Sequence, residues 1–351
     1  MVELADWGRL KDGTPVTHAQ MQEEAGHMFR VMSYGATLTS IRTPDRSGSV
    51  DDVLLGFDDL EPYGDTGLQA NWPYLGATVG RYANRIAEGR FTIDDRVVQL
   101  DRNEGANQNH GGPQGFDRKH WAMEALPGTE GVRLRYTSQS GEEGFPGTLD
   151  VEADFLLGAP GELIIRYRAK TSEPTHVNLA SHGYFNLAGR ATRTIASHRL
   201  TIAAKRFVPI NAEALPVGEL MSVEGTPFDL RSGRLLSEIF EANHQQLCVA
   251  DGLNHCFCLS DGRSRAARLE DHASGRYLDI VTTEPGLQVY TANAFNGSIR
   301  DGAGRPFVRR QAIALEAQHY PDSPNRPDFP STLLRPGETY QTETRLRFGA
   351  H

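Results

Sequence analysis

The chain has 351 residues, three cysteines, a formal net charge of −9 and a pI near 5.8. This length allows a sizeable core without metals or disulfides, but it does not by itself decide between one large domain and two average ones. The acidic balance argues against general affinity for nucleic acid or anionic membranes, so functions that need a basic surface are set aside.

The start of the chain and its cysteines point to one compartment. Residues 1–7 lack the basic and then apolar pattern of a secretory signal, and no apolar run approaches a membrane span. Cys256 and Cys258 are too close along the chain for an ordinary bridge and lack the paired spacing of a zinc site, and Cys248 has no partner. We therefore expect three buried thiols in a cytoplasmic protein.

Short alternating segments separated by glycine and proline recur along the chain. The pattern predicts β-hairpins over residues 91–100 and 150–169, whereas helical periodicity is thin and best developed over residues 232–241. No linker, low-complexity block or repeat divides the chain. We expect one antiparallel domain over residues 1–351, a sandwich or barrel whose concave face holds a ligand.

Two glycine-containing segments carry candidate ligand-binding groups. Arg81 and Arg85 could each donate hydrogen bonds to ligand oxygens, or could equally be surface charges in ion pairs. The Gly111-Gly112 pair allows close backbone approach, so His110 could face a pocket, although Gly-Gly also simply marks turns. Both segments stay open between a functional and a structural interpretation.

A histidine and a glutamate are the best candidates for proton transfer. His182 lies between the small residues Ser181 and Gly183, which leave room for a ligand beside a ring that titrates near neutral pH. Glu316 interrupts an apolar stretch, where a carboxylate is unfavourable unless paired or functional. The alternatives are a hydrogen-bonded histidine in a packed sheet and a glutamate that points outward.

Other catalytic schemes find little support. The chain has no Gly-x-Ser-x-Gly elbow, phosphate-binding glycine loop or His-Glu-x-x-His motif. His110, His182, His255 and Glu316 could ligate a metal, but no short ligand spacing supports it. The paired glutamates within residues 141–147 suggest a solvated turn rather than glycosidase carboxylates, because neighbours on a strand face opposite sides.

Taken together, these segments resemble the aldose 1-epimerase (galactose mutarotase) family. The match runs from about Tyr34 to Phe348 and includes the ranges 80–86, 109–117, 141–147, 177–189, 285–291, 315–325, 329–332 and 334–338. The resemblance implies an all-β fold: a large antiparallel β-sandwich of the galactose mutarotase-like supersandwich type, with few short helices. It further implies no metal or organic cofactor, and a free monosaccharide as the substrate.

The resemblance also implies a reaction, the interconversion of the α and β anomers of a free aldose by acid/base ring opening and closure. Glu316 would be the general base that removes the proton of the C1 hydroxyl, and His182 the general acid that protonates the ring oxygen. Such positioned groups each contribute roughly 10²–10⁴-fold to a rate. Ring closure returns both protons, so no cofactor is consumed.

The remaining site residues follow from the same match. His110 would assist at the ring oxygen or orient the sugar, Arg85 and Gln288 would bind hydroxyls, and Asn84 would support Arg85. Many family members carry Asp-His-Asn-Phe where this chain begins the motif with Asn254, a neutral amide in place of a sugar-binding carboxylate. The preferred aldose therefore stays open.

Two alternatives are compatible with the same resemblance. The protein could bind or sense sugars without turnover, although binding alone would not need both Glu316 and His182. It could also act on a phosphorylated hexose, which would call for an arginine cluster beyond Arg81 and Arg85. The sequence is compatible with a monomer or a homodimer.

Overall fold

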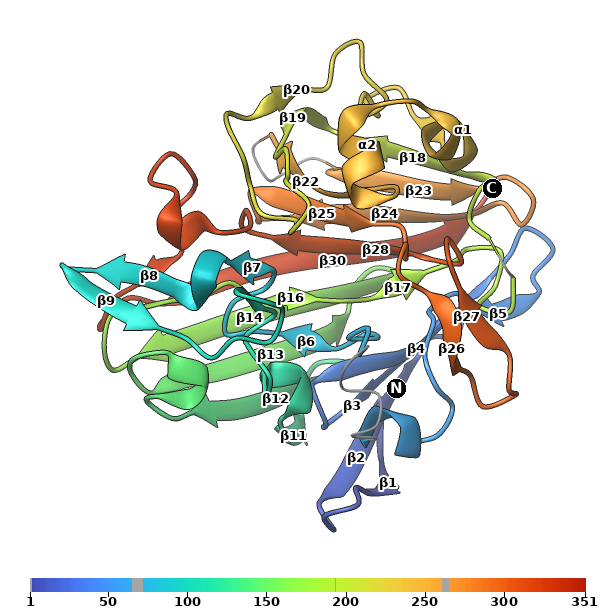
Figure 1. The fold of residues 1–351 in the computed structure, drawn as a ribbon. Helices are drawn as coiled ribbons and strands as arrows, with labels where there is room; N and C mark the ends of the chain where they lie inside the picture. The colour runs from blue at the N-terminus through green and yellow to red at the C-terminus, as the bar shows by residue number, and fades with distance from the viewer. Residues whose placement is uncertain (1, 65–71, 193, 261–264) are drawn as a thin grey trace.

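The computed structural model describes residues 2–64, 72–192, 194–260 and 265–351 (Figure 1). Strands and turns dominate, and two short helices, α1 (Leu236–Glu241) and α2 (Gln245–Ala250), lie beside each other. Single 3₁₀ turns occur at Glu61–Gly64, Ala87–Gly89, Phe116–Arg118, Glu142–Gly144 and Ser323–Asn325. In the part of the chain described here, no helix is both long and apolar enough to cross a membrane.

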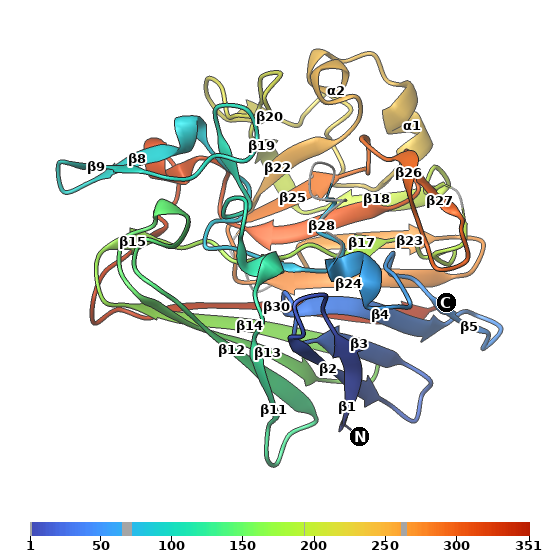
Figure 2. The same ribbon diagram turned by 60° about the horizontal axis from the view of Figure 1, so that its bottom comes forward.

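The largest sheet has nine antiparallel strands and forms one layer of the molecule (Figure 2). In spatial order they are β11 (Ala122–Ala125), β12 (Gly131–Ser138), β13 (Leu149–Leu157), β14 (Glu162–Thr171), β30 (Tyr340–Ala350), β24 (Arg276–Thr282), β23 (Ala267–Asp271), β18 (His198–Ile202) and β21 (Arg234–Leu235). The pair β13–β14 is the hairpin predicted over residues 150–169, so this prediction is confirmed.

A six-stranded antiparallel sheet packs on the first and carries the site. Its strands, in spatial order, are β17 (Tyr184–Phe185), β28 (Ile313–Gln318), β25 (Gly286–Tyr290), β22 (Asn254–Leu259), β19 (Ala204–Phe207) and β20 (Met221–Ser222). Leu315 and Ala317 of β28 join the main core together with Leu346 of β30. Because strand side chains alternate, Glu316 points to the opposite face, away from this core. The predicted β-sandwich with few short helices is confirmed.

Smaller sheets accompany the two large ones. An N-terminal sheet contains β1 (Val2–Arg9), β2 (Pro15–Gln22), β3 (Met28–Met32), β4 (Thr37–Pro44) and β5 (Val50–Asp52). Two-stranded pairs are β6 (Thr78–Val79) with β16 (Ala180–Ser181), β7 (Arg85–Ile86) with β10 (Gln108–Asn109), β8 (Arg90–Ile93) with β9 (Arg96–Gln99), β15 (Thr175–His176) with β29 (Leu333–Leu334), and β26 (Asn296–Arg300) with β27 (Pro306–Val308). The β8–β9 pair confirms the predicted hairpin over residues 91–100.

Two local predictions need correction. The expected helix over residues 232–241 begins later, at Leu236, because Arg234–Leu235 extends as β21 and pairs with β18. The expectation of three buried thiols is wrong for Cys248, which is exposed, whereas Cys256 is buried and Cys258 partly so. Cys248 lies on α2, whose buried side chains are those of Gln246 and Leu247.

Candidate active site

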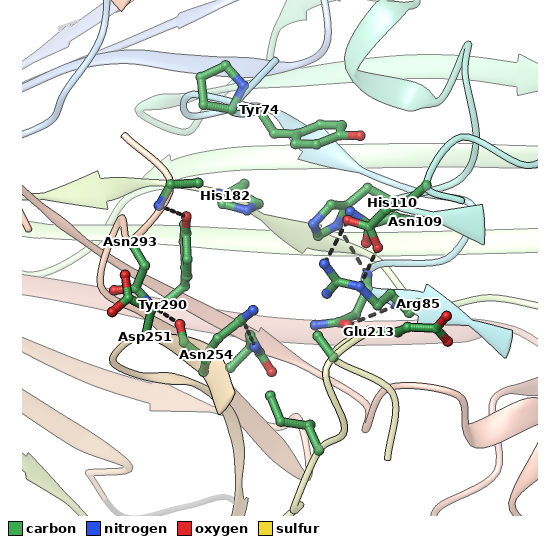
Figure 3. Close-up of a pocket in the computed structure, with 18 of the residues that line it drawn as sticks. Tyr74, Arg85, Asn109, His110, His182, Glu213, Asp251, Asn254, Tyr290 and Asn293 are labelled. Atoms are coloured by element: carbon green, nitrogen blue, oxygen red, sulfur yellow. Dashed lines mark hydrogen bonds and ion pairs between the residues drawn. The ribbon is translucent and has the colours of Figure 1, made fainter. Parts of the chain in front are cut away.

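A cavity of about 720 Å³ lies on the face of the six-stranded sheet that points away from the core (Figure 3). Its lining includes all seven side chains that the sequence resemblance assigns to a site: Asn84, Arg85, His110, His182, Asn254, Gln288 and Glu316. These residues come from segments more than 200 positions apart, so only the folded sheet brings them together. A cavity of this size and mixed polarity is typical of a small-molecule site.

Three neighbouring strands form the floor of this cavity. Gln288 of β25 lies directly opposite Glu316 of β28, and β22 on the other side contributes Asn254. Gln288 Nε2 donates a hydrogen bond of 2.8 Å to Asn254 Oδ1. That contact uses one of the two lone pairs of the Asn254 oxygen and leaves its amide nitrogen free to donate to a ligand. Gln288 Oε1 is buried and has no hydrogen-bond partner among the described residues.

The carboxylate of Glu316 and the imidazole of His182 form a buried pair. His182 Nε2 lies 3.5 Å from Glu316 Oε1, and the two side chains are only 5% and 2% exposed. Burial raises the pKa of Glu316 to about 8 and lowers the pKa of His182 to about 4, because each charged form loses its hydration. Within the described structure, Glu316 Oε2 and His182 Nδ1 lack hydrogen-bond partners.

The His110 ring enters the cavity from the turn after β10. A Cβ at Gly111 would lie 1.7 Å from the carbonyl oxygen of Gly80, so only glycine lets this turn pack on residues 80–85. The Asn84 N–H donates 3.1 Å to His110 Nδ1. Burial, assisted by the neighbouring His182 and Arg85, holds the pKa of His110 well below its ordinary value. The ring is therefore neutral, with its proton on Nε2.

Three of these groups lie close enough together to bind a metal ion in principle. His110, His182 and Glu316 each offer one ligand atom, and these atoms lie within 4.8 Å of one another. However, the Asn84 N–H occupies the Nδ1 lone pair of His110 and leaves the ring proton on Nε2, which disfavours ligation by either nitrogen. His255, considered with them from sequence, points elsewhere and contacts Gln246 at 3.1 Å. The cluster suits proton transfer better than metal binding.

The two arginines of the segment 80–86 have different roles. Arg85 lines the cavity, and its guanidinium donates 2.8 Å to Glu104, leaving donors toward the cavity. Arg81 is neither a surface charge nor a ligand group. It is buried and donates to Ser138 and to the backbone carbonyls of residues 138, 139, 146 and 147. The functional interpretation of Arg81 is therefore wrong, because all its donors hold the fold together.

Several lining residues were not found from sequence. Glu104, which pairs with Arg85, and Tyr74, whose ring contacts both histidines, belong to no motif that signals a site. Tyr184 lies two residues after His182 and could have been suspected from that spacing alone. The paired glutamates of 141–147 are half-buried rather than solvated, since Glu142 accepts hydrogen bonds from two side chains.

Fold and site together define a β-sandwich protein with a buried histidine–glutamate pair in a cavity of small-molecule size. A model of the aldose 1-epimerase family matches residues 17–347. The chain belongs to the aldose 1-epimerase family and is an isomerase, as the sequence resemblance predicted.

Curated relatives span nearly the whole chain. The galactose mutarotase of Homo sapiens is 41% identical over 352 residues, covering 99% of this chain and 98% of the relative. The aldose 1-epimerase of Escherichia coli is 37% identical over 342 residues, or 96% of each chain. A crystal structure of an aldose epimerase homologue from C. elegans superposes with a TM-score of 0.85 at 28% identity, covering 94% of this chain and 98% of that one.

Proposed function

We propose that residues 1–351 act as one domain that interconverts the anomers of a free aldose, with Glu316 as general base and His182 as general acid. The observation that carries this proposal is the buried His182–Glu316 pair at 3.5 Å, whose pKa values are shifted in opposite directions. Titrating groups whose environments separate their pKa values are typical of acid/base catalysis.

The proton count of the pair fits a reversible ring opening. Glu316 takes the proton of the C1 hydroxyl while His182 gives one to the ring oxygen, so the C1–O5 bond breaks and an aldehyde forms. The pair passes from carboxylate and imidazolium to two neutral groups, and its total proton number does not change. Rotation about C1–C2 and the reverse transfers then close the other anomer. Burial favours the neutral pair, which is the state that accompanies the open chain.

The other lining groups would hold the sugar. The proton on His110 Nε2 suits a hydrogen bond to the ring oxygen, and the free donors of Arg85 and the unpartnered Gln288 Oε1 suit hydroxyls. Asn84 positions both neighbours, since its N–H holds His110 and its Oδ1 accepts the N–H of Arg85 at 2.9 Å.

A free sugar is favoured over a phosphorylated one. Arg85 is the one lysine or arginine among the described lining residues, and Glu104 balances its charge. Glu213 and Asp251 add negative charge at the cavity, which would oppose a phosphate. We also propose a cytoplasmic location, supported by the three free cysteines.

Polarimetry of freshly dissolved α-anomers tests the function. Glu316→Gln and His182→Asn should each lower the catalysed rate roughly 10²–10⁴-fold. Glu152→Gln, the same change on the outer face of the large sheet, should leave it unchanged. Near-native rates in a folded Glu316→Gln protein would contradict the proposal.

The preferred aldose is tested at the position that departs from the family pattern. Asn254→Asp removes the amide donor and adds an acceptor that Gln288 can still contact. We expect the ratio of kcat/KM for galactose and glucose to change by about tenfold, the scale of one hydrogen bond to a charged group. An unchanged ratio would show that this position does not select the sugar.

A further inference from the structure

Two tyrosine rings flank the imidazole of His182. The ring centroid of Tyr184 lies 4.9 Å from that of His182, with 31° between the planes, and Tyr74 lies at 5.9 Å and 26°. Tyr74 also contacts His110 at 4.6 Å, and Figure 3 shows it above both histidines. The Tyr74 ring is stacked on the imidazole and the Tyr184 ring is tilted against it, and both centroids lie within the roughly 6 Å over which a ring face attracts a cation.

The backbone of His182 holds the Tyr74 turn in place. Gly76 N–H donates 2.9 Å to the His182 carbonyl, and His182 N–H donates 2.8 Å to the Ala77 carbonyl. A Cβ at Gly76 would lie 1.8 Å from the carbonyl oxygen of Leu38, so the turn needs glycine there. Tyr74 itself has φ 57°, an unfavourable conformation for a bulky residue that persists only where its surroundings enforce it.

Tyr184 is held in place by strand pairing rather than by a turn. It is 2% exposed and pairs across β17–β28 with Ala314, two residues before Glu316. The backbone of Tyr184 is therefore held by the strand that carries the proposed base. Backbone hydrogen bonds thus tie the turn after Tyr74 to His182, and strand pairing holds Tyr184 next to β28.

The side chains that face His182 offer little else that would stabilise a positive charge on its ring, apart from Glu316. These groups are Glu316, His110, Tyr74 and Tyr184. His110 is neutral, and burial opposes a charge on His182, yet the proposed general acid must carry a proton. The negative face of an aromatic ring attracts a cation, most strongly where water is excluded.

We propose that Tyr74 and Tyr184 are positioning residues that act through His182, stabilising its protonated form with their ring faces and fixing its ring plane. The inference rests on the proposed role of His182 as general acid. It assigns to these tyrosines a part in catalysis that needs no contact with the sugar.

Pairs of substitutions distinguish the effect of the aromatic ring face from that of the hydroxyl group and of side-chain bulk. Tyr74→Phe keeps an aromatic face and loses the hydroxyl, whereas Tyr74→Leu keeps apolar bulk and loses the face. Because Tyr74 is only half-buried, these two variants are the decisive pair, and Tyr184→Phe and Tyr184→Leu repeat the comparison at a fully buried position. Circular dichroism first establishes that each variant is folded.

Loss of a ring face should weaken the protonated imidazole. We expect Tyr74→Leu to move the acid limb of the pH–rate profile to lower pH by up to about one unit and to lower kcat about tenfold. Because Tyr74 also lines the cavity, a change in KM would report a lost contact with the sugar, whereas the position of the acid limb reports the protonation of His182. Tyr74→Phe should keep the acid limb of the unmodified protein and lose less than about threefold in kcat.

The direction in which the acid limb of the pH–rate profile moves distinguishes loss of the ring face from entry of water into the site. If the leucine variants merely admitted water, imidazolium would gain hydration and the acid limb would move to higher pH. A shift to higher pH, or no shift, in folded Tyr74→Leu would overturn the proposal.

NMR titration of His182 tests the role of the tyrosines independently of the proposed catalytic function. The His182 resonance, assigned with His182→Asn, reports the same titration without any turnover. An unshifted His182 titration in Tyr74→Leu would refute the role of the tyrosines even if His182 is the acid. A shifted titration together with near-native activity of His182→Asn would instead refute the proposed function.

Discussion

Charged side chains on the outer face of the nine-stranded sheet are ion-paired, whereas two deeply buried titratable groups in the cavity of the six-stranded sheet each keep a polar atom without a partner among the described residues. On the outer face, β12 presents Arg133 and Arg135, which face Asp154 and Glu152 of β13 at 2.6 and 2.9 Å. Arg168 of β14 adds a further positive charge beside them. Opposite charges on neighbouring strands pair across the sheet, where solvent still reaches most of them.

In the cavity, two deeply buried titratable groups are not satisfied in this way. Glu316 and His182 are nearly inaccessible to water, and each has a polar atom without a partner among the described residues. Their pKa values are shifted by burial, whereas those of Arg133 and Arg135 are raised mainly by hydrogen bonds to carboxylates. The charges on the outer face are therefore satisfied by ion pairs, whereas burial shifts the pKa values of two cavity groups that each keep an unpartnered polar atom among the described residues.

The largest expected contrast is in the pH dependence of the rate. The His182–Glu316 pair holds one proton between about pH 4 and about pH 8, the range set by the two shifted pKa values. We expect kcat to fall about tenfold per pH unit beyond either limit. Polarimetry corrected for spontaneous mutarotation measures this, with Arg135→Gln as the outer-face control. A flat profile through pH 9 would show that Glu316 does not set the alkaline limb.

Arg81 represents a third case, a buried charge with all donors engaged. Arg81→Gln leaves several buried carbonyls without donors, so we expect a loss of roughly 3–5 kcal/mol in the free energy of unfolding. Urea denaturation measures the change. Arg81→Lys keeps the charge but not the planar fork, and it should recover only part of the loss. Full recovery would mean that charge alone matters.

The proposed base should reduce stability as the pH rises. Between pH 6.5 and 8, Glu316 is protonated in the folded protein but ionised in the unfolded chain, so folding takes up a proton and stability falls with increasing pH. His182 is neutral in the folded protein throughout this window, and its unfolded form titrates near the lower edge of the window in both proteins, so its contribution cancels in the comparison. Glu316→Gln removes the effect, and its urea-denaturation curves should separate from those of the unmodified protein by about 2 kcal/mol over the window. Parallel curves would contradict the shifted pKa.

The smallest effect is expected on the outer face. A double-mutant cycle on Arg135 and Glu152, with Gln at both positions, should give a coupling of about 0.2–1 kcal/mol that decreases in high salt. Catalysis should be unchanged in all three variants. A coupling above about 2 kcal/mol would mean that this face behaves like a buried network.

Local pattern was enough to predict much of the architecture. Alternation over residues 150–169 predicted the β13–β14 hairpin. The start of the helix at Leu236 was not predictable in this way, because the preceding residues pair as β21 with the distant strand β18. The order of the motifs identified the family, and with it seven of the side chains that line the cavity. Strand alternation alone could not decide whether Glu316 points into a ligand site or outward to solvent.

The sequence by itself determined which segments alternate, where turns interrupt them and which titratable residues the family motifs contain. Only the tertiary structure decided that Arg81 is a structural residue, that Asn84 sets the tautomer of His110, and that Tyr74 covers His182. The physical reason is that pleat and turn are local properties of the chain, whereas burial and proton affinity depend on neighbours that sheet pairing brings from distant positions.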